Sequence, residues 1–204
     1  MSDKSKKQSR RQHIRQRQRR QQSMSKGIFI IAAAIAIGFV VYLVSTNPSV
    51  DRPTESVGVS VAQMSDSGHV ETGIDVDYST NPPTSGQHYG APMPAGVYNA
   101  GDIIAPFPES NIVHSMEHGY VVFWYNCSSM SLAACEQLKS QIAAVLSKVG
   151  GQKVIVYPWN TIAESLVMTS WTQIQRFSTF DADLAADFVL ANRSHPRAPE
   201  PNVP

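Results

Sequence analysis

The feature that most constrains this chain is an uncharged apolar run of eighteen residues, GIFIIAAAIAIGFVVYLV, at residues 27–44. At about 1.5 Å of rise per residue, a helix of this length covers roughly 27 Å, which matches the hydrocarbon core of a bilayer. An amphipathic helix of a soluble protein would carry polar residues at every third or fourth position, and this run has none. The run therefore predicts a single N-terminal transmembrane helix.

The charges on the two sides of this run are opposite. Residues 1–26 hold ten Lys/Arg and one acidic residue, whereas the other 178 residues hold seven Lys/Arg and fifteen acidic residues, so the net charge of +1 hides a strong asymmetry. The positive-inside rule then places residues 1–26 in the cytoplasm and residues 45–204 outside the plasma membrane. A cleaved signal peptide has a shorter apolar region and a small-residue cleavage site, so we favour a retained anchor.

The same asymmetry indicates the partners. The predicted anchor implies membrane lipid, and the basic arm is suited to anionic headgroups. An unidentified membrane or surface protein stays open as a further partner. An acidic chain beyond the arm excludes a uniformly basic domain that binds nucleic acid.

The chain length allows one modest globular domain. We expect a basic cytoplasmic arm at residues 1–26, the transmembrane helix at residues 27–44, a stalk at residues 45–67, an extracytoplasmic globular domain at residues 68–193 and a disordered, proline-rich tail at residues 194–204.

Within the globular domain, the stretch up to Asn111 is rich in proline and glycine and is expected to be loop-like. The second half has regular patterns, which predict strands at residues 120–125, at residues 153–157 and within residues 163–171, and helices at residues 132–149 and 181–191. This order predicts an α+β fold with a short mixed sheet, two helices and a long loop-rich first half.

Two cysteines, Cys127 and Cys135, follow the first of these strands. Outside the cytoplasm such a pair usually forms a disulfide, which here would join the end of the strand to the start of the next helix. A redox-active dithiol and a soft metal site are the alternatives. Redox motifs generally separate their cysteines by two residues, whereas seven separate this pair, so a structural disulfide is favoured.

Four of the six histidines, His69, His88, His114 and His118, fall within fifty residues. His114 and His118 are four residues apart, a spacing that places both imidazoles on one face of a helical turn, with Glu117 beside them. Such a set suits Zn²⁺ or Cu²⁺. The HExxH pattern of zinc proteases is absent, and the other interpretation is that each histidine only forms hydrogen bonds within a turn.

The segments around these histidines resemble an uncharacterised bacterial family of membrane-anchored proteins classed as a domain of unknown function. The resemblance rests on GHV at 68–70, YSTNPPTSGQHYG at 78–90, GVY at 96–98, VHSMEHGYVVFWY at 113–125 and APEP at 198–201. It implies an N-terminal anchor and an exported domain and brings no established activity.

The family pattern carries five of the candidate positions, and this chain departs from it at Gln87, where Pro is common, and at Met116, where Leu is common. The methionine leaves open a softer, copper-like ligand, although a buried apolar side chain is its more common use. The five positions are His69, His88, His114, Glu117 and His118.

Three functions are compatible with these residues. The leading hypothesis is a membrane-anchored domain that binds copper or zinc through the four histidines and Glu117. The first alternative is a non-enzymatic interaction or assembly module at the cell surface, whose histidines are structural. The second is a metal-dependent hydrolase with Glu117 as the general base. The glycine patterns of nucleotide-binding loops are absent, so no organic cofactor is expected.

Overall fold

The computed structural model describes residues 57–102 and 106–204. The basic arm, the predicted transmembrane run and about half of the predicted stalk lie outside these residues. Among the described residues, no helix is both long enough and apolar enough to cross a membrane.

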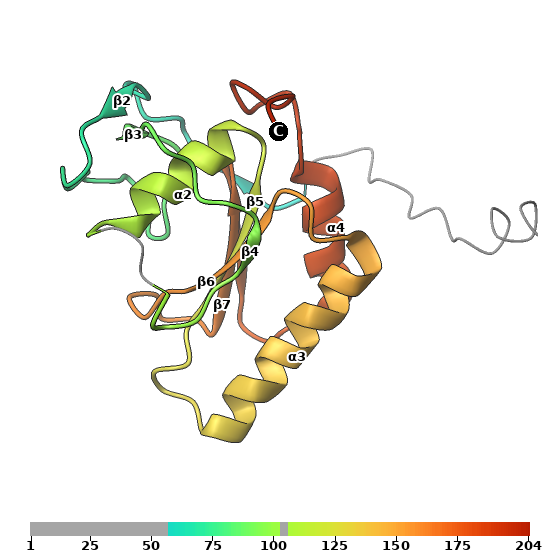
Figure 1. Cartoon of the computed structure of the whole chain (residues 1–204). Coiled ribbons are helices and arrows are strands. Elements are labelled where there is room, and N and C mark those ends of the chain that lie inside the picture. The colour runs from blue at the N-terminus through green and yellow to red at the C-terminus, as the bar shows by residue number, and fades with distance from the viewer. Residues whose placement is uncertain (1–56, 103–105) are drawn as a thin grey trace, which may run out of the picture. The chain divides into compact units, whose positions relative to one another are not determined.

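The described residues form an α+β fold around a six-stranded mixed sheet with the strand order β1-β8-β7-β5-β6-β4 (Figure 1). The strand β5 at its centre pairs in parallel with β6 and antiparallel with β7, and β7 pairs antiparallel with β8. The strands are β1 (Val59–Ser60), β4 (Gly96–Val97), β5 (Val121–Tyr125), β6 (Val154–Pro158), β7 (Leu166–Ser170) and β8 (Gln173–Phe177).

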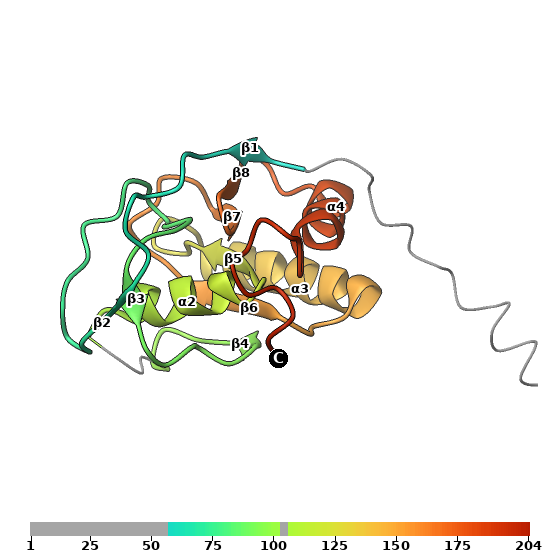
Figure 2. The same cartoon turned by 90° about the horizontal axis from the view of Figure 1, so that it is seen from above.

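Three helices of the described region cover the two faces of this sheet (Figure 2). The helices α3 (Leu132–Val149) and α4 (Ala182–Asn192) lie on one face, and α2 (Pro108–Glu117) lies on the other. Successive side chains of a strand point to opposite faces, so β5 serves both layers. Phe123 packs in the cluster with α3 and α4, whereas Trp124 packs in the cluster with α2.

The helix α3 has the bounds predicted from its apolar spacing. The side chain of Ser131 caps its first turn by accepting a hydrogen bond from the backbone N–H of Ala134. Gly150, with a φ of 80°, ends it in a conformation that other residues rarely adopt. The helix connects β5 to its parallel neighbour β6, which makes β5-α3-β6 a βαβ unit.

The first half of the domain is loop-rich, as expected. Between residues 57 and 102 the strands are only two residues long, and two of them, β2 (His69–Val70) and β3 (His88–Tyr89), form a separate parallel pair. The loop before β3 does not lie on the surface, because residues 82–86 are buried. At Gly86, φ is 126° and an added Cβ would lie 2.7 Å from the Sδ atom of Met64, so only glycine fits there.

Three expectations are corrected by the fold. A third helix, α2, begins at Pro108, inside the stretch expected to be a loop up to Asn111. The strand β8 was not predicted, because its sequence QIQRF is too polar to give an apolar run. The tail from Ser194 was expected to be disordered, but it packs on the domain: Ala198 is buried in the core beneath α2.

Candidate metal centre

The first part of the candidate site is the short parallel pair β2–β3. In its register His69 lies directly opposite His88, and the two ring centroids are 5.0 Å apart. The side chain of His88 is fully buried, whereas His69 is exposed. This pair therefore joins one imidazole inside the domain to one that faces solvent.

The second part is the C-terminal turn of α2. As predicted, His114 and His118 share one face there, with ring centroids 4.7 Å apart. The ring of His114 also stacks on that of His69 at 4.9 Å and lies 5.0 Å from that of His88. An Oε2 atom of Glu117 lies 3.0 Å from Nε2 of His88. The structure thus brings all five predicted site residues into one cluster, which we call the histidine cluster.

Backbone carbonyls fix the orientation of the two buried rings at its centre. Nδ1 of His88 donates a hydrogen bond to the carbonyl of Gly86 at 2.9 Å, and Nδ1 of His114 donates one to the carbonyl of Tyr89 at 2.6 Å. A carbonyl oxygen only accepts, so Nδ1 of each ring carries a proton. In the neutral form of His114 the lone pair is then on Nε2, whereas Nε2 of His88 is engaged in its 3.0 Å contact with the Oε2 atom of Glu117. Histidines that bind metal ions commonly donate their second ring nitrogen in this way.

The surroundings of His114 favour its neutral form. Burial lowers the pKa of this imidazole, and the neighbouring histidines act in the same direction, while the hydrogen bond to Tyr89 opposes them. A neutral imidazole keeps the lone pair that a metal ion requires.

Two overlapping sets of ligand atoms meet at His114. In each set the candidate atoms lie within 4.8 Å of one another. Ligand nitrogens around a tetrahedral zinc ion are about 3.4 Å apart, so rotation of the side chains would bring either set into range. The sets are His69, His88 and His114, and His114, Glu117 and His118.

The tail contributes a carboxylate that the sequence did not single out. An Oε2 atom of Glu200 lies 3.2 Å from Nε2 of His118, and the backbone N–H of Glu200 donates to the carbonyl of Glu117. The APEP segment at 198–201 was the only signal for it, and a proline-rich stretch predicts disorder rather than packing.

The close approach of the tail depends on Gly119, which follows the histidines. Its φ is 80°, and an added Cβ would lie 2.8 Å from the Cα atom of Ser194. The Nζ atom of Lys153 donates hydrogen bonds to the carbonyls of His118 and Pro201, which ties the tail to the end of α2.

Met116 is not part of the histidine cluster. It is fully buried in the core beneath α2, and its sulfur accepts a hydrogen bond from the hydroxyl of Thr169 at 3.3 Å. The apolar use of this methionine is therefore the one observed, and a thioether ligand from this residue does not fit.

Cys127 and Cys135 form a disulfide, as predicted. It joins the segment after β5 to the first turns of α3.

The fold and the cluster define an α+β domain with a histidine-rich candidate metal centre at one end of α2. A family described as "Protein of unknown function (DUF3105)" matches residues 69–204, which is two thirds of the chain, so the protein belongs to this family. No curated protein and no solved structure matches the chain.

Proposed function

We propose that this protein is a membrane-anchored, extracytoplasmic domain that binds a copper or zinc ion through the histidine cluster. The supporting observation is the pair of buried rings, His88 and His114, whose Nδ1 atoms are bound to backbone carbonyls. The Nε2 atom of His114 is then a donor for an ion, and Nε2 of His88 becomes one when the ion replaces its contact with Glu117.

The burial of the histidine rings also favours a bound metal ion. Burying several polar rings together is costly unless each finds a partner. A metal ion would serve the Nε2 atoms of the cluster at once, and its positive charge would also compensate the Glu117 carboxylate beside His88. Imidazole nitrogens with one carboxylate suit Zn²⁺ or Cu²⁺ better than Ca²⁺ or Mg²⁺, which prefer oxygen ligands.

Within the cluster, we assign His88 and His114 as central ligands and His69 as the third. Glu117, which already contacts His88, is available as a fourth. His69 is the exposed member, so the ion would enter from its side.

The test is the metal content of the full-length protein, purified in detergent and loaded with Zn²⁺ or Cu²⁺. We expect close to one equivalent in the wild type and a loss of at least about tenfold in affinity for His69→Ala and His114→Gln, since each removes one ligand. His13→Ala, in the basic arm, is the matched control and should bind like the wild type. Equal, near-zero metal in all four proteins would refute the proposal and favour the interaction module.

We also propose that residues 27–44 anchor the protein in the plasma membrane with the domain outside, on the strength of the basic arm that precedes them. Protease added to intact spheroplasts should remove a tag placed after Pro204. A tag that survives until the membrane is broken would reverse the orientation.

A further inference from the structure

A second candidate site lies at the opposite end of α2. A cavity of about 600 Å³ opens at the C-terminal ends of the parallel strands β5 and β6. Tyr125, Tyr157 and Trp159 provide aromatic walls, and the first turn of α2 closes one side with Pro108 and Glu109. Ligand sites commonly occur at this end of parallel strands and in pockets that are mostly apolar.

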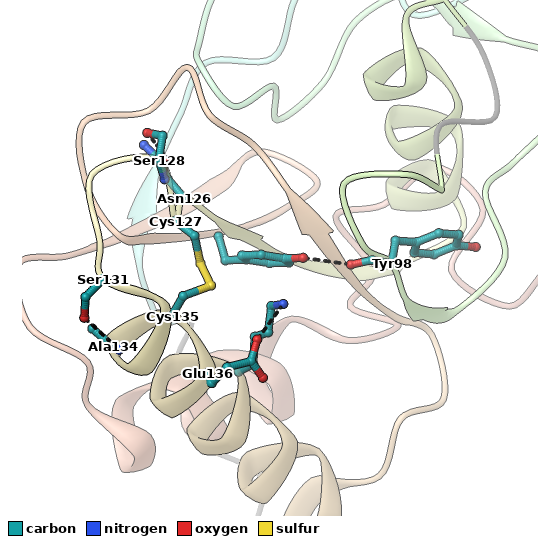
Figure 3. Close-up of a disulfide and its surroundings, with 10 residues drawn as sticks. Tyr98, Asn126, Cys127, Ser128, Ser131, Ala134, Cys135 and Glu136 are labelled. Atoms are coloured by element: carbon teal, nitrogen blue, oxygen red, sulfur yellow. Dashed lines mark hydrogen bonds and ion pairs between the residues drawn. A yellow bond between two sulfur atoms is a disulfide. The ribbon is translucent and has the colours of Figure 1, made fainter.

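The disulfide forms part of the wall of this cavity. Cys127 lies two residues after the end of β5, and Cys135 lies in the first turns of α3, as Figure 3 shows. Both cysteines line the cavity, and Cys127 is half-buried, whereas Cys135 is buried. Redox-active cysteine pairs are known beside βαβ units such as β5-α3-β6.

The surroundings of the two sulfurs differ. Cys135 is close to the N-terminus of α3, where the helix dipole stabilises a thiolate. Lys139 is one turn further along the same helix and lines the same cavity. Its Nζ atom lies 5.7 Å from the centre of the Tyr125 ring and 3.2 Å from the Oε1 atom of Glu136. A thiolate is therefore better stabilised on Cys135, which makes this sulfur the better leaving group.

We infer that the Cys127–Cys135 disulfide is a thiol–disulfide exchange centre that oxidises a dithiol in a polypeptide segment held in the cavity. A thiolate of the segment attacks Sγ of Cys127, a mixed disulfide forms, and Cys135 leaves as the thiolate. The second thiolate of the segment then attacks the substrate sulfur of the mixed disulfide and releases Cys127. The segment loses two electrons and two protons and gains a disulfide, while the protein disulfide is reduced to two thiols.

The walls of the cavity indicate the kind of segment. Three aromatic rings and several prolines favour apolar or aromatic residues beside the reacting cysteine. Leu132, at the start of α3 and three residues before Cys135, is 80% exposed. The substrate class is thus a cysteine pair flanked by aromatic or aliphatic side chains. This site does not depend on a metal ion in the histidine cluster.

The test measures reduction of the disulfide in the full-length, folded protein, followed by acid quench, alkylation and intact mass. The probes are a dithiol peptide with Trp beside each cysteine, the same peptide with Ser in place of Trp, and reduced glutathione. We expect the Trp peptide to react about tenfold faster with this disulfide than with oxidised glutathione. It should also react several times faster than the Ser peptide.

Two lysines of α3 provide matched variants. Lys139→Gln should slow the reaction about three- to tenfold, because it removes a cation that lines the same cavity as Cys135. Lys148→Gln, on the same helix and paired with Asp183, should leave the rate unchanged. A single-cysteine peptide should give a mixed disulfide that mass spectrometry maps to Cys127.

Three outcomes would overturn the inference. Reduction that occurs only in denaturant would make the disulfide purely structural. Equal rates for the two lysine variants, or for the two peptides, would show that the cavity plays no part in the reaction. A mixed disulfide on Cys135 would contradict the assigned direction of attack.

Discussion

The histidine cluster and the disulfide cavity lie at opposite ends of α2 and are built in different ways. The cluster gathers side chains from β2, β3, the last turn of α2 and the tail, and side-chain bonds to backbone carbonyls hold its rings in place. The cavity is formed largely where regular elements end, at β5, β6 and α3. The geometry of the histidine cluster therefore depends on a few buried polar contacts, whereas the geometry of the cavity depends on the sheet.

This difference has a consequence for how each region responds to substitution. Removing a buried polar side chain leaves its partners without hydrogen bonds inside the protein, which is costly. Removing the covalent link at the cavity leaves the strands and helices around it intact. Loss of a histidine should thus affect stability and metal binding together, whereas loss of the disulfide should affect stability and leave metal binding unchanged.

The largest effect is expected for His88→Ala. This ring is fully buried, and its removal leaves a cavity, an unpaired carbonyl at Gly86 and an unpaired carboxylate at Glu117. The free energy of unfolding should fall by about 2–4 kcal/mol. Denaturant unfolding of the full-length protein in detergent measures this, and His69→Ala, at the exposed position, is the control. Equal stability for the two variants would remove the structural role of His88.

The next effect is expected for the double variant Cys127→Ser/Cys135→Ser. Without this cross-link the unfolded chain has more conformational freedom. The free energy of unfolding should therefore fall by roughly 2–3 kcal/mol. The metal content should stay at the wild-type level, since no candidate ligand touches the disulfide. If metal binding falls with the disulfide, the two regions are coupled and the contrast between them does not hold.

A smaller effect is expected for pH. Burial holds the pKa of His114 below its ordinary value of 6.5, so the unfolded chain takes up this proton at a higher pH than the folded one does. The stability that accompanies the neutral ring is present above pH 6.5 and is lost as the pH falls below it. In the metal-free protein, the melting temperature of the wild type should decline more steeply with falling pH than that of His114→Gln. His13→Ala should keep the wild-type slope, and a wild-type slope in His114→Gln would refute the assignment.

The smallest effect is expected for Glu200→Gln. This carboxylate is half-exposed, and exposed ion pairs contribute less than about 1 kcal/mol. The backbone contact of residue 200 with Glu117 is kept in this variant, so the tail should stay in place. Differential scanning calorimetry should show a small decrease in melting temperature. A decrease as large as that of His88→Ala would mean that the contact between Glu200 and His118 stabilises the cluster as strongly as the buried ring does.

The sequence predicted the regular part of the fold well. The strand at residues 120–125 and the helix at residues 132–149 have continuous or periodic apolar patterns, and such patterns are specified locally. The helix α2 was missed because it is short and begins within a proline-rich stretch, and its side chains include one histidine and two glutamates. The disulfide was predicted because two cysteines outside the cytoplasm usually pair, and a strand that leads into a helix brings residues 127 and 135 together.

The candidate site could be predicted only as a set of residues. The spacing of His114 and His118 predicts their shared face. No local sequence pattern predicts that β2 pairs with β3, which brings His69 to His88. Glu200 reaches His118 only because Gly119 lets the tail approach. The orientation of each ring is likewise set by carbonyls of distant residues, and such contacts depend on the completed tertiary structure.

The length of α2 has one further consequence. Its ten residues span about 15 Å, with one end at the aromatic cavity and the other at the histidines. A copper ion and a pair of thiols in direct contact would react with each other, since thiols reduce Cu²⁺ and bind the product. If both proposed sites operate, a helix of this length would separate the copper ion from the thiols and allow one small domain to carry both.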